Sequence, residues 1–339
     1  MTSDLLPDVP ASSPDTAVSA LEISSLQVSL QGRQASTSLV TDVSLAVAPG
    51  EIVGLVGESG SGKSLTALAC MGLLPRGVVI AAGDVRLSGV SLVGMERKKL
   101  RALRGSAISM IFQDPLTSLD PCARIGSQIV ETILAHRDVT AAEARKDAVE
   151  LLDRVGIPRA TERMRAYPHE FSGGMRQRVM IAAALVLRPR VLIADEPTTA
   201  LDVTTQAGIV ELVLELRREL GMAVVWISHD LGLIGQLADR VAVMYAGEVV
   251  EMAGMRDLFV TPRHPYTHGL IDSARRGEYG ELFGFIRGNV AEPGHWAAGC
   301  RFAPRCERVV AGCEQHPELR PLDQASVRCI NPMTRDGAQ

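Results

Sequence analysis

Lysine, aromatic side chains and long apolar segments are all scarce in this sequence. Only four of its 35 basic residues are lysines, and aromatic residues make up 4% of its 339 positions. No apolar run approaches the roughly 20 residues that a membrane-spanning helix needs, and the longest, near Val179–Leu187, suits a buried helix. The formal net charge is −4, so the composition excludes a general nucleic-acid binder and we expect no nucleic-acid partner.

The first 20 residues lack the features of a secretory signal. They contain no Lys or Arg, since the first basic residue is Arg33, and they have no long apolar core. Their Pro, Ser and Asp content predicts a disordered tail at residues 1–20. We therefore expect a protein of the reducing cytosol, where disulfides are a poor explanation of six cysteines.

Strand-like and helix-like stretches alternate from about residue 21 to residue 258. Hydrophobic residues make up 46% of the chain, which is enough for a sizeable core. The alternation predicts an α/β domain with a mostly parallel sheet over residues 21–258. Residues 115–178 have helical spacing and predict a helical subdomain. From about residue 259 the periodicity fades, and residues 259–339 are predicted to form a small C-terminal extension that holds four of the six cysteines.

The segment "GESGSGKS" begins at Gly57, after the apolar run "EIVGLVG" and before a helical stretch. It fits the pattern G-x-x-x-x-G-K-[ST], in which glycines allow backbone N–H groups to face the β-phosphate of a nucleotide. The helix that follows adds the positive end of its dipole. Lys63 is placed to reach the β- and γ-phosphates, and the Ser64 hydroxyl to bind Mg²⁺. The predicted ATP-binding residues of this segment are Gly57, Glu58, Ser59, Gly60, Ser61, Gly62, Lys63, Ser64 and Leu65.

A second buried strand, "VLIADE", ends in two carboxylates. Asp195 at its carboxyl end is placed to hold Mg²⁺ through water, and Glu196 to polarise an attacking water. Some twenty residues earlier, "FSGGMRQR" supplies a second anion-binding turn from Ser172, Gly173 and Gly174. An isolated Ser-Gly-Gly is more often a flexible loop, so this turn gains meaning only from the strand that follows it.

In combination, these motifs resemble the ATP-binding subunits of ABC transporters over residues 21–258. The resemblance implies a P-loop NTPase of the ABC ATPase type, with an antiparallel β subdomain beside the core sheet. It also implies roles for Gln113 in "FQDP", Asp202 in "TTALD" and His229 in "ISHD". Gln113 would sense Mg²⁺ and the attacking water, Asp202 would lie at the subunit interface, and His229 would touch the γ-phosphate. The implied catalytic residues are Glu196, His229 and Gln113, and the implied Mg²⁺ ligands are Ser64, Gln113 and Asp195.

The resemblance further implies a mechanism and a set of partners. Two subunits would close head to tail around two ATP molecules, with Ser172, Gly173, Gly174 and Asp202 of one facing the ATP held by the other. Hydrolysis would reopen the pair. The partners would be two membrane permease subunits, a second ATPase that is the same or a related chain, and an extracytoplasmic substrate-binding protein. The chain would lie peripherally on the cytoplasmic face of the inner membrane.

One departure from that family concerns the adenine. Its members often stack the base on an aromatic residue upstream of the phosphate loop, but this chain has no Phe, Tyr or Trp before Phe112. Thr37 or a neighbour occupies the expected place. Stacking is worth about 1–3 kcal/mol per base, so ATP binding should survive its loss, or an aromatic from elsewhere supplies it.

Four further segments resemble the dipeptide, oligopeptide and nickel importers of this family. They are "IFQDPLTSLDP" (residues 111–121), Met175 where glutamine is more usual, "RHPYTHGL" (residues 263–270) and "GCRFAPRC" (residues 299–306). The resemblance implies an importer ATPase for di- or oligopeptides or for nickel. The cargo itself would be chosen by the permeases and the binding protein.

The C-terminal cysteines follow the spacing Cys300-x5-Cys306-x6-Cys313-x15-Cys329. This is not the C-x2-C knuckle of common zinc sites, so the spacing alone is a weak sign of ligation. Thiolates nevertheless suit Zn²⁺ and iron–sulfur clusters, and some importers of this group carry a four-iron four-sulfur cluster here. The resemblance implies a 4Fe–4S cluster on these four cysteines. Zinc, with His316 as a replacement ligand, and four free thiols remain alternatives; Cys70 and Cys122 are expected to be ordinary.

Other functions remain open at this stage. A soluble ABC ATPase acting on ribosomes or DNA is one alternative, although such proteins carry two cassettes or a long coiled coil, and only about 130 residues separate Lys63 from Asp195. A nucleotide-gated metal sensor is another, against which an intact Glu196 argues. A sugar-importer ATPase is a third, but a β-rich regulatory domain would then be expected in place of the cysteine segment.

Overall fold

The computed structural model describes residues 18–32, 35–114, 118–198, 203–274 and 286–333. Contacts within the chain divide it into two units. The first unit comprises residues 1–21, 48–50 and 87–225, and the second comprises residues 22–47, 51–86 and 226–339.

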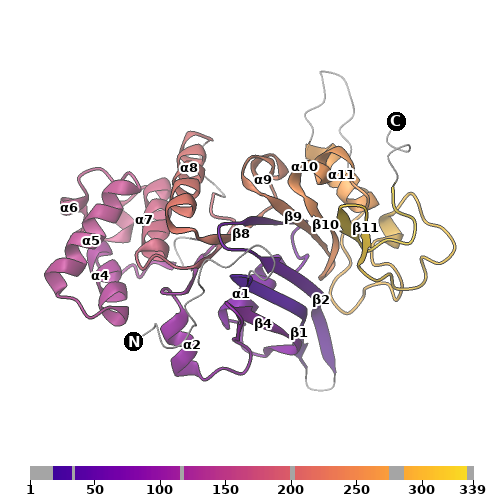
Figure 1. Ribbon diagram of the computed structural model, residues 1–339, viewed down its shortest axis with the longest axis horizontal. Coiled ribbons are helices and arrows are strands. Elements are labelled where there is room, and N and C mark those ends of the chain that lie inside the picture. The colour runs from indigo at the N-terminus through magenta and orange to yellow at the C-terminus, as the bar shows by residue number, and fades with distance from the viewer. Residues whose placement is uncertain (1–17, 33–34, 115–117, 199–202, 275–285, 334–339) are drawn as a thin grey trace. The chain divides into compact units, whose positions relative to one another are not determined.

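The second unit is built on a mixed sheet (Figure 1). In it, β3 (Ile52–Val56) pairs in parallel with β9 (Arg240–Tyr245), and β9 pairs antiparallel with β10 (Glu248–Gly254). The sheet continues antiparallel through β12 (Ala325–Val327) to β11 (Arg320–Leu322). All five residues of β3 are buried, which explains its continuous apolar sequence. The last two strands come from the C-terminal stretch, whose fading periodicity did not predict them.

A smaller sheet of the same unit has the strand order β2-β1-β4. Its strands alternate buried and exposed residues over much of their length, as half-buried strands do. The helices of this unit are short, and α9 packs against β3. The bounds are β1 (Leu21–Gln31), β2 (Ser36–Val47), β4 (Val78–Leu87), α1 (Lys63–Met71), α9 (Leu231–Leu237), α10 (Met255–Val260) and α11 (Pro265–Ala274).

The first unit contains most of the longer helices (Figure 1). Within it, β6 (Ile108–Ile111) and β7 (Val191–Asp195) pair in parallel, and α4 and α5 both pack against α7. β8 (Ala223–Ser228) begins in this unit and ends in the other. The remaining bounds are β5 (Val90–Ser91), α2 (Arg97–Leu103), α4 (Ile125–His136), α5 (Ala141–Arg154), α6 (Ala160–Arg163), α7 (Gly173–Leu185) and α8 (Val203–Leu220).

Local sequence explains two of these helices directly. α5 starts at a capping box between Thr140 and Glu143, and buries Ala144, Ala148 and Leu152 at four-residue spacing. α7 buries residues around most of its circumference, as the apolar run near Val179–Leu187 predicted. α5 lies within residues 115–178, for which helical structure was expected, whereas α7 begins in that stretch and continues to Leu185.

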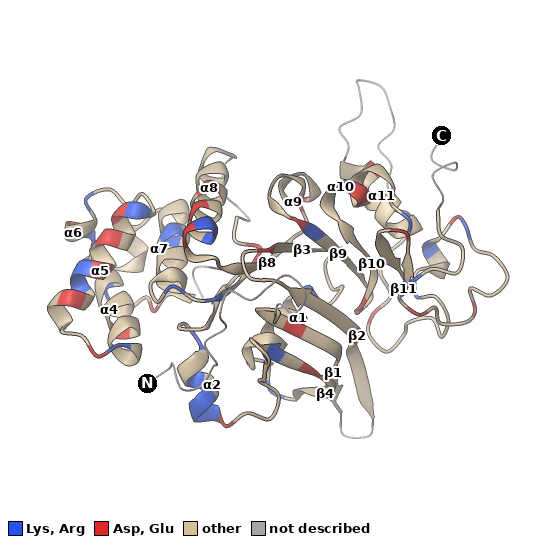
Figure 2. Ribbon diagram, in the orientation of Figure 1, with Lys and Arg blue, Asp and Glu red and all other residues tan. Residues whose placement is uncertain are grey.

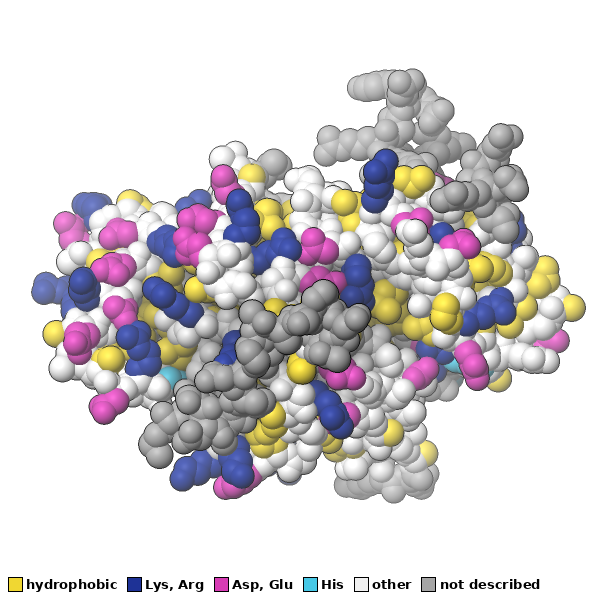
Figure 3. Space-filling view, viewed as in Figure 1, with side chains coloured by type: hydrophobic (Ala, Val, Ile, Leu, Met, Phe, Trp, Pro, Cys, Tyr) yellow, Lys and Arg dark blue, Asp and Glu magenta, His cyan; other side chains and the backbone are white. Residues whose placement is uncertain are grey.

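Charge is distributed without one dominant sign on the visible face. α2 carries Arg97, Lys98, Lys99 and Arg101 among its seven residues, and it is drawn largely in blue in Figure 2. In Figure 3, basic and acidic side chains are interspersed over the described surface. Among the described residues, no helix is both long enough and apolar enough to cross a membrane.

Candidate nucleotide site

The phosphate loop follows β3 and leads into α1, as the sequence predicted. Its glycines hold backbone angles that other residues avoid, with φ of 151° at Gly57, 77° at Gly60 and 101° at Gly62. A Cβ atom at Gly57 would collide with the carbonyl oxygen of Met244 on β9, so the loop packs directly on the sheet. α1 has no side-chain cap and no acidic residue in its first turn, so its N-terminus offers a favourable end to an anion.

Lys63 lies inside this loop rather than in solvent. Its side chain is buried, and its Nζ donates hydrogen bonds to the carbonyl oxygens of Gly57 at 2.8 Å and Glu58 at 2.9 Å. These bonds hold its ammonium group within the phosphate loop. The buried position of this rare lysine accords with a specific role.

The phosphate loop is fastened to the C-terminal part of the second unit at Glu58. The hydroxyl of Tyr266 accepts a hydrogen bond from the Glu58 N–H at 2.9 Å. Arg305 donates to both carboxylate oxygens of Glu58, at 2.9 and 3.1 Å, and its own side chain is only 7% exposed. Arg305 also lies over the ring of Tyr245, 5.7 Å from its centroid. Neither Tyr266 nor Arg305 was predicted as a site residue, although both lie in the segments 263–270 and 299–306 that resemble peptide importers.

In the first unit, the structure brings Gln113 and Glu196 together. The Gln113 Nε2 donates a hydrogen bond to the Glu196 Oε2 at 3.0 Å. Glu196 follows β7 directly and has a φ of 48°, a left-handed conformation that costs a non-glycine residue about 1–3 kcal/mol. Asp195, the last residue of β7, is buried. Two residues predicted to act on the same water are therefore hydrogen-bonded to each other.

The Ser-Gly-Gly turn begins α7 in the same unit. Ser172 is the N-cap of the helix, and its hydroxyl accepts a hydrogen bond from the Met175 N–H at 3.3 Å. Among the described residues, no atom from outside this helix turn lies within 4 Å of where a Cβ at Gly173 would be, so the helix N-terminus is open toward that part of the chain. An open helix N-terminus with a serine cap is suited to receive an anion.

The other predicted residues have the following places. His229 is exposed and follows β8, and Leu65 lies in the first turn of α1. Gly174 is in the first turn of α7. Asp202 lies outside the described residues. The second unit thus holds the phosphate loop and His229, and the first holds Gln113, Asp195, Glu196 and the Ser-Gly-Gly turn.

The four C-terminal cysteines line one small pocket of the second unit. Cys300, Cys306, Cys313 and Cys329 share it with Phe302 and His264, and the space that a water molecule could occupy is about 10 Å³. Burial raises the pKa of the Cys300 and Cys306 thiols, and it raises that of Cys329 to about 11, with the neighbouring thiols adding to the effect. Over the described residues, however, no group of three or more His, Cys, Asp and Glu side chains has the arrangement of a preformed metal site. The four cysteines therefore line one pocket, but their side chains are not arranged as the ligands of a metal ion.

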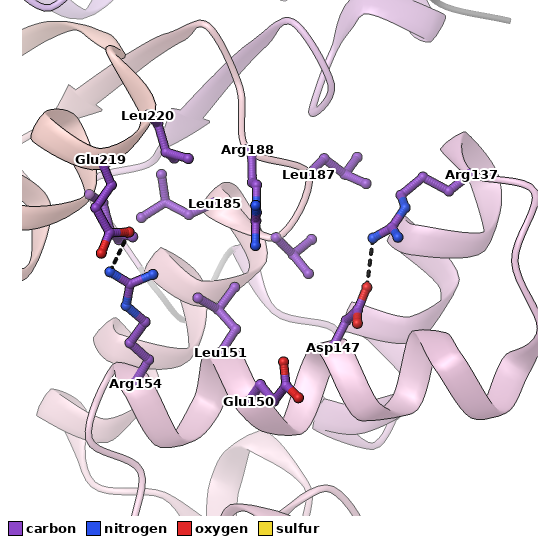
Figure 4. A pocket seen from close by; sticks show the side chains of 12 residues that line it. Arg137, Asp147, Glu150, Leu151, Arg154, Leu185, Leu187, Arg188, Glu219 and Leu220 are labelled. Carbon is purple, nitrogen blue, oxygen red and sulfur yellow. Dashed lines mark hydrogen bonds and ion pairs between the residues drawn. The ribbon is translucent and has the colours of Figure 1, made fainter.

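A larger pocket lies in the first unit between α5, α7 and α8, with a free volume of about 570 Å³ (Figure 4). Leucines line its floor. Two ion pairs lie at its rim, Arg137 with Asp147 and Arg154 with Glu219, both at 2.6 Å. None of the predicted site residues lines this pocket, so its size does not make it the nucleotide site.

The comparisons with known proteins agree with this geometry. The chain is 44% identical to the oligopeptide transport ATP-binding protein OppD of Salmonella typhimurium over 331 residues, which cover 97% of this chain and 98% of that protein. It belongs to the ATP-binding subunits of ABC transporters. The OppD of Escherichia coli is also 44% identical, over 92% of this chain and 93% of its own. The ABC transporter family model matches residues 40–199, and that of the oligopeptide/dipeptide transporter C-terminal region matches residues 250–313.

Solved structures of ABC cassettes resemble the chain as well. A dimeric bacterial ABC transporter cassette matches with a TM-score of 0.63 and 27% identity, over 70% of this chain and 99% of its own. The same cassette bound to ADP and phosphate, after hydrolysis, matches equally well. The predicted ABC ATPase fold is thereby confirmed, and the chain is an ATPase subunit of an ABC transporter.

Proposed function

We propose that this chain is the ATP-hydrolysing motor of an importer for di- or oligopeptides, or for nickel. The observation that carries the proposal is the 44% identity to OppD over nearly the whole of both chains. The match to the oligopeptide/dipeptide transporter C-terminal region supports the same subgroup. The chain would lie on the cytoplasmic face of the inner membrane, bound to two permeases and fed through them by an extracytoplasmic binding protein.

Each site residue has a distinct part in the proposed reaction. The loop from Gly57 to Leu65 binds the phosphates of ATP, with Lys63 turning from the loop carbonyls toward the β- and γ-phosphates. Glu196 accepts a proton from the attacking water. Gln113 orients that water, and its hydrogen bond to Glu196 keeps the two side chains together. His229 contacts the γ-phosphate. Ser64, Gln113 and Asp195 would hold an Mg²⁺ ion, which would neutralise charge on the phosphates.

A second copy of the chain, or a related ATPase, completes the site. The open N-terminus of α7, with Ser172, Gly173 and Gly174, would face the γ-phosphate of the ATP bound by the partner. Asp202 would line the same interface. Closure and reopening of this pair would drive the permeases. The dimeric state of the similar cassette supports this arrangement.

Uptake by living cells tests the proposed cargo. Deleting the gene should abolish import of radiolabelled tri-alanine, and the wild-type gene but not Glu196→Gln should restore it. Loss of radioactive nickel uptake instead would assign the chain to nickel. Normal uptake of both, together with a protein that stays in the soluble fraction during membrane isolation, would favour the alternative of an ABC ATPase that is not coupled to transport.

We further propose that the four C-terminal cysteines hold a 4Fe–4S cluster. Their convergence on one pocket supports a shared ligand, and their thiols suit a soft metal. His316 does not line that pocket, and its Nε2 instead lies 2.8 Å from the Glu248 carboxylate, which weakens the alternative of zinc with a histidine ligand. The pocket has room for about one water, so its walls would have to move apart to admit a cluster.

Metal analysis of anaerobically purified protein tests this assignment. We expect about four irons and four sulfides per chain and a broad absorption band near about 400 nm. Cys313→Ser should lose the iron, whereas Cys122→Ser, at an exposed cysteine outside the pocket, should keep it. Zinc at about one per chain would replace the cluster by a structural metal, and protein free of both metals would leave four free thiols.

A further inference from the structure

The second unit offers an aromatic ring close to where the sequence lacks one. The C-terminal segment runs past Thr37, the position at which related ATPases often stack adenine. A Cβ at Gly294 would lie 3.3 Å from the Cγ2 atom of Thr37. Two residues further along the chain is Trp296, one of only two tryptophans in the protein.

Gly247 lies close both to Trp296 and to Gly62 of the phosphate loop. A Cβ at Gly247, in the turn between β9 and β10, would meet both the Cη2 atom of Trp296 and the carbonyl oxygen of Leu39 at 2.7 Å. In turn, a Cβ at Gly62 of the phosphate loop would lie 3.5 Å from the Cα of Gly247. The indole thus lies near Leu39 of β2 and near Gly62 of the phosphate loop.

The ring is held in place from one side. The guanidinium carbon of Arg301 lies 4.0 Å from the ring centroid, and the indole Nε1 donates to the carbonyl oxygen of Ala291 at 3.1 Å. The Arg301 side chain is itself only 9% exposed and is fixed by a hydrogen bond to the Thr41 hydroxyl at 3.0 Å. Arg301 covers one face of this partly exposed ring and Gly247 lies at its Cη2 edge, so a base would have to stack on the face opposite Arg301.

We propose that Trp296 is the stacking platform for the adenine of ATP in this chain. The C-terminal segment thereby supplies the aromatic surface that the upstream segment lacks. A planar base would lie on the face of the indole opposite Arg301, and cation–π contact on one face is compatible with base stacking on the other. The inference rests on the phosphate-loop site proposed above, because the base is placed relative to that loop.

Fluorescence can follow Trp296 by itself. The other tryptophan, Trp226, is buried in β8, and over the described residues its Nε1 has no hydrogen-bond partner, so Trp226→Phe removes its emission and keeps an aromatic ring without breaking a hydrogen bond. In that variant, ATP should quench the emission of Trp296, because a base stacks on it. Tripolyphosphate, which has the phosphates and no base, should bind without quenching it.

Binding measurements then separate base from phosphate. Trp296→Leu should weaken ATP affinity by about 5- to 150-fold, as loss of one stacked base does, and leave tripolyphosphate affinity unchanged. Trp296→Phe should restore most of the ATP affinity. If Trp296→Leu leaves ATP affinity unchanged, or weakens both ligands equally, Trp296 is only a structural anchor of the segment and the inference is overturned.

The Lys63→Ala variant keeps this test distinct from that of the phosphate loop. It should lose affinity for ATP and tripolyphosphate alike. If wild-type protein binds neither ligand, the phosphate-loop assignment fails and the stacking inference falls with it. If wild-type protein binds tripolyphosphate but ATP binding does not respond to position 296, only the stacking inference fails.

Discussion

Glu196 has a backbone conformation that few glutamates adopt. Glu196 directly follows β7 and has a positive φ, and its carboxylate accepts a hydrogen bond from Gln113. Backbone strain of this kind is retained where the surrounding structure fixes it and is concentrated at functional sites. At the scale of single residues, the predicted base is therefore distinguished by its geometry as well as by its motif.

Removing the charge of Glu196 should stop hydrolysis without stopping ATP binding. We expect Glu196→Gln to lower kcat by about 10²- to 10⁴-fold, which is the contribution of a positioned general base. Phosphate release measures kcat, and equilibrium binding measures ATP affinity. Glu211→Gln, an exposed residue of α8, is the matched control and should behave as wild type. Hydrolysis at more than a tenth of the wild-type rate in Glu196→Gln would assign the base elsewhere.

At the scale of elements, the phosphate loop and the C-terminal segment form one packed assembly in the second unit. Arg305 and Tyr266 both bind Glu58. The rings of Tyr245, Tyr266 and Phe302 pack against one another in tilted and edge-to-face contacts, with 4.7–5.4 Å between centroids. Phe302 and Arg305 both lie between Cys300 and Cys306 in the sequence. A change in the cysteine pocket, such as metal binding, would therefore be transmitted through Phe302 and Arg305 to the phosphate loop.

Cutting this connection should cost both stability and nucleotide affinity. Arg305→Ala removes two charge-assisted hydrogen bonds from a nearly buried side chain, and we expect a loss of about 1.5–3 kcal/mol in the free energy of unfolding. The KM for ATP should rise in parallel, because Glu58 is part of the loop. Denaturant unfolding and steady-state ATPase assays measure the two effects.

The control for this prediction is Arg287→Ala. Arg287 is 77% exposed and its contact with Glu307 is long, at 3.9 Å, so its loss should change stability by less than about 0.5 kcal/mol. An Arg305→Ala protein with unchanged stability and unchanged KM would show that the loop does not depend on the C-terminal segment.

At the scale of the whole molecule, the open N-terminus of α7 predicts ATP-dependent dimerisation. The Glu196→Gln protein should trap ATP, and light scattering should then give the molar mass of a dimer. Without nucleotide it should give that of a monomer. Adding Gly173→Asp should block the dimer, because it sets a carboxylate where the partner's γ-phosphate would lie. The space around Gly173 admits this side chain, and an acidic residue is favourable in the first turn of a helix. A dimer that persists in the double variant would contradict the proposed interface.

Some of the site was predictable because its chemistry is local. The loop between β3 and α1, the carboxylate pair at the end of β7 and the cap of α7 each depend on residues within a few positions of one another. Glycines, a lysine and a hydrophobic strand at fixed spacing dictate such a turn wherever it occurs. Helical periodicity likewise predicted helices between residues 115 and 178, where α4, α5 and α6 lie.

The tertiary structure decided which distant residues meet the loop. Arg305 is 247 positions from Glu58, and Arg301 is 260 positions from Thr41, so no local periodicity links them. Packing of the C-terminal segment against β10 through β12 brings those residues together, along with Trp296 and the four cysteines. The sequence by itself determined the phosphate chemistry and the family, because motifs are short; only the fold decided what surrounds the nucleotide, because long-range packing selects those neighbours.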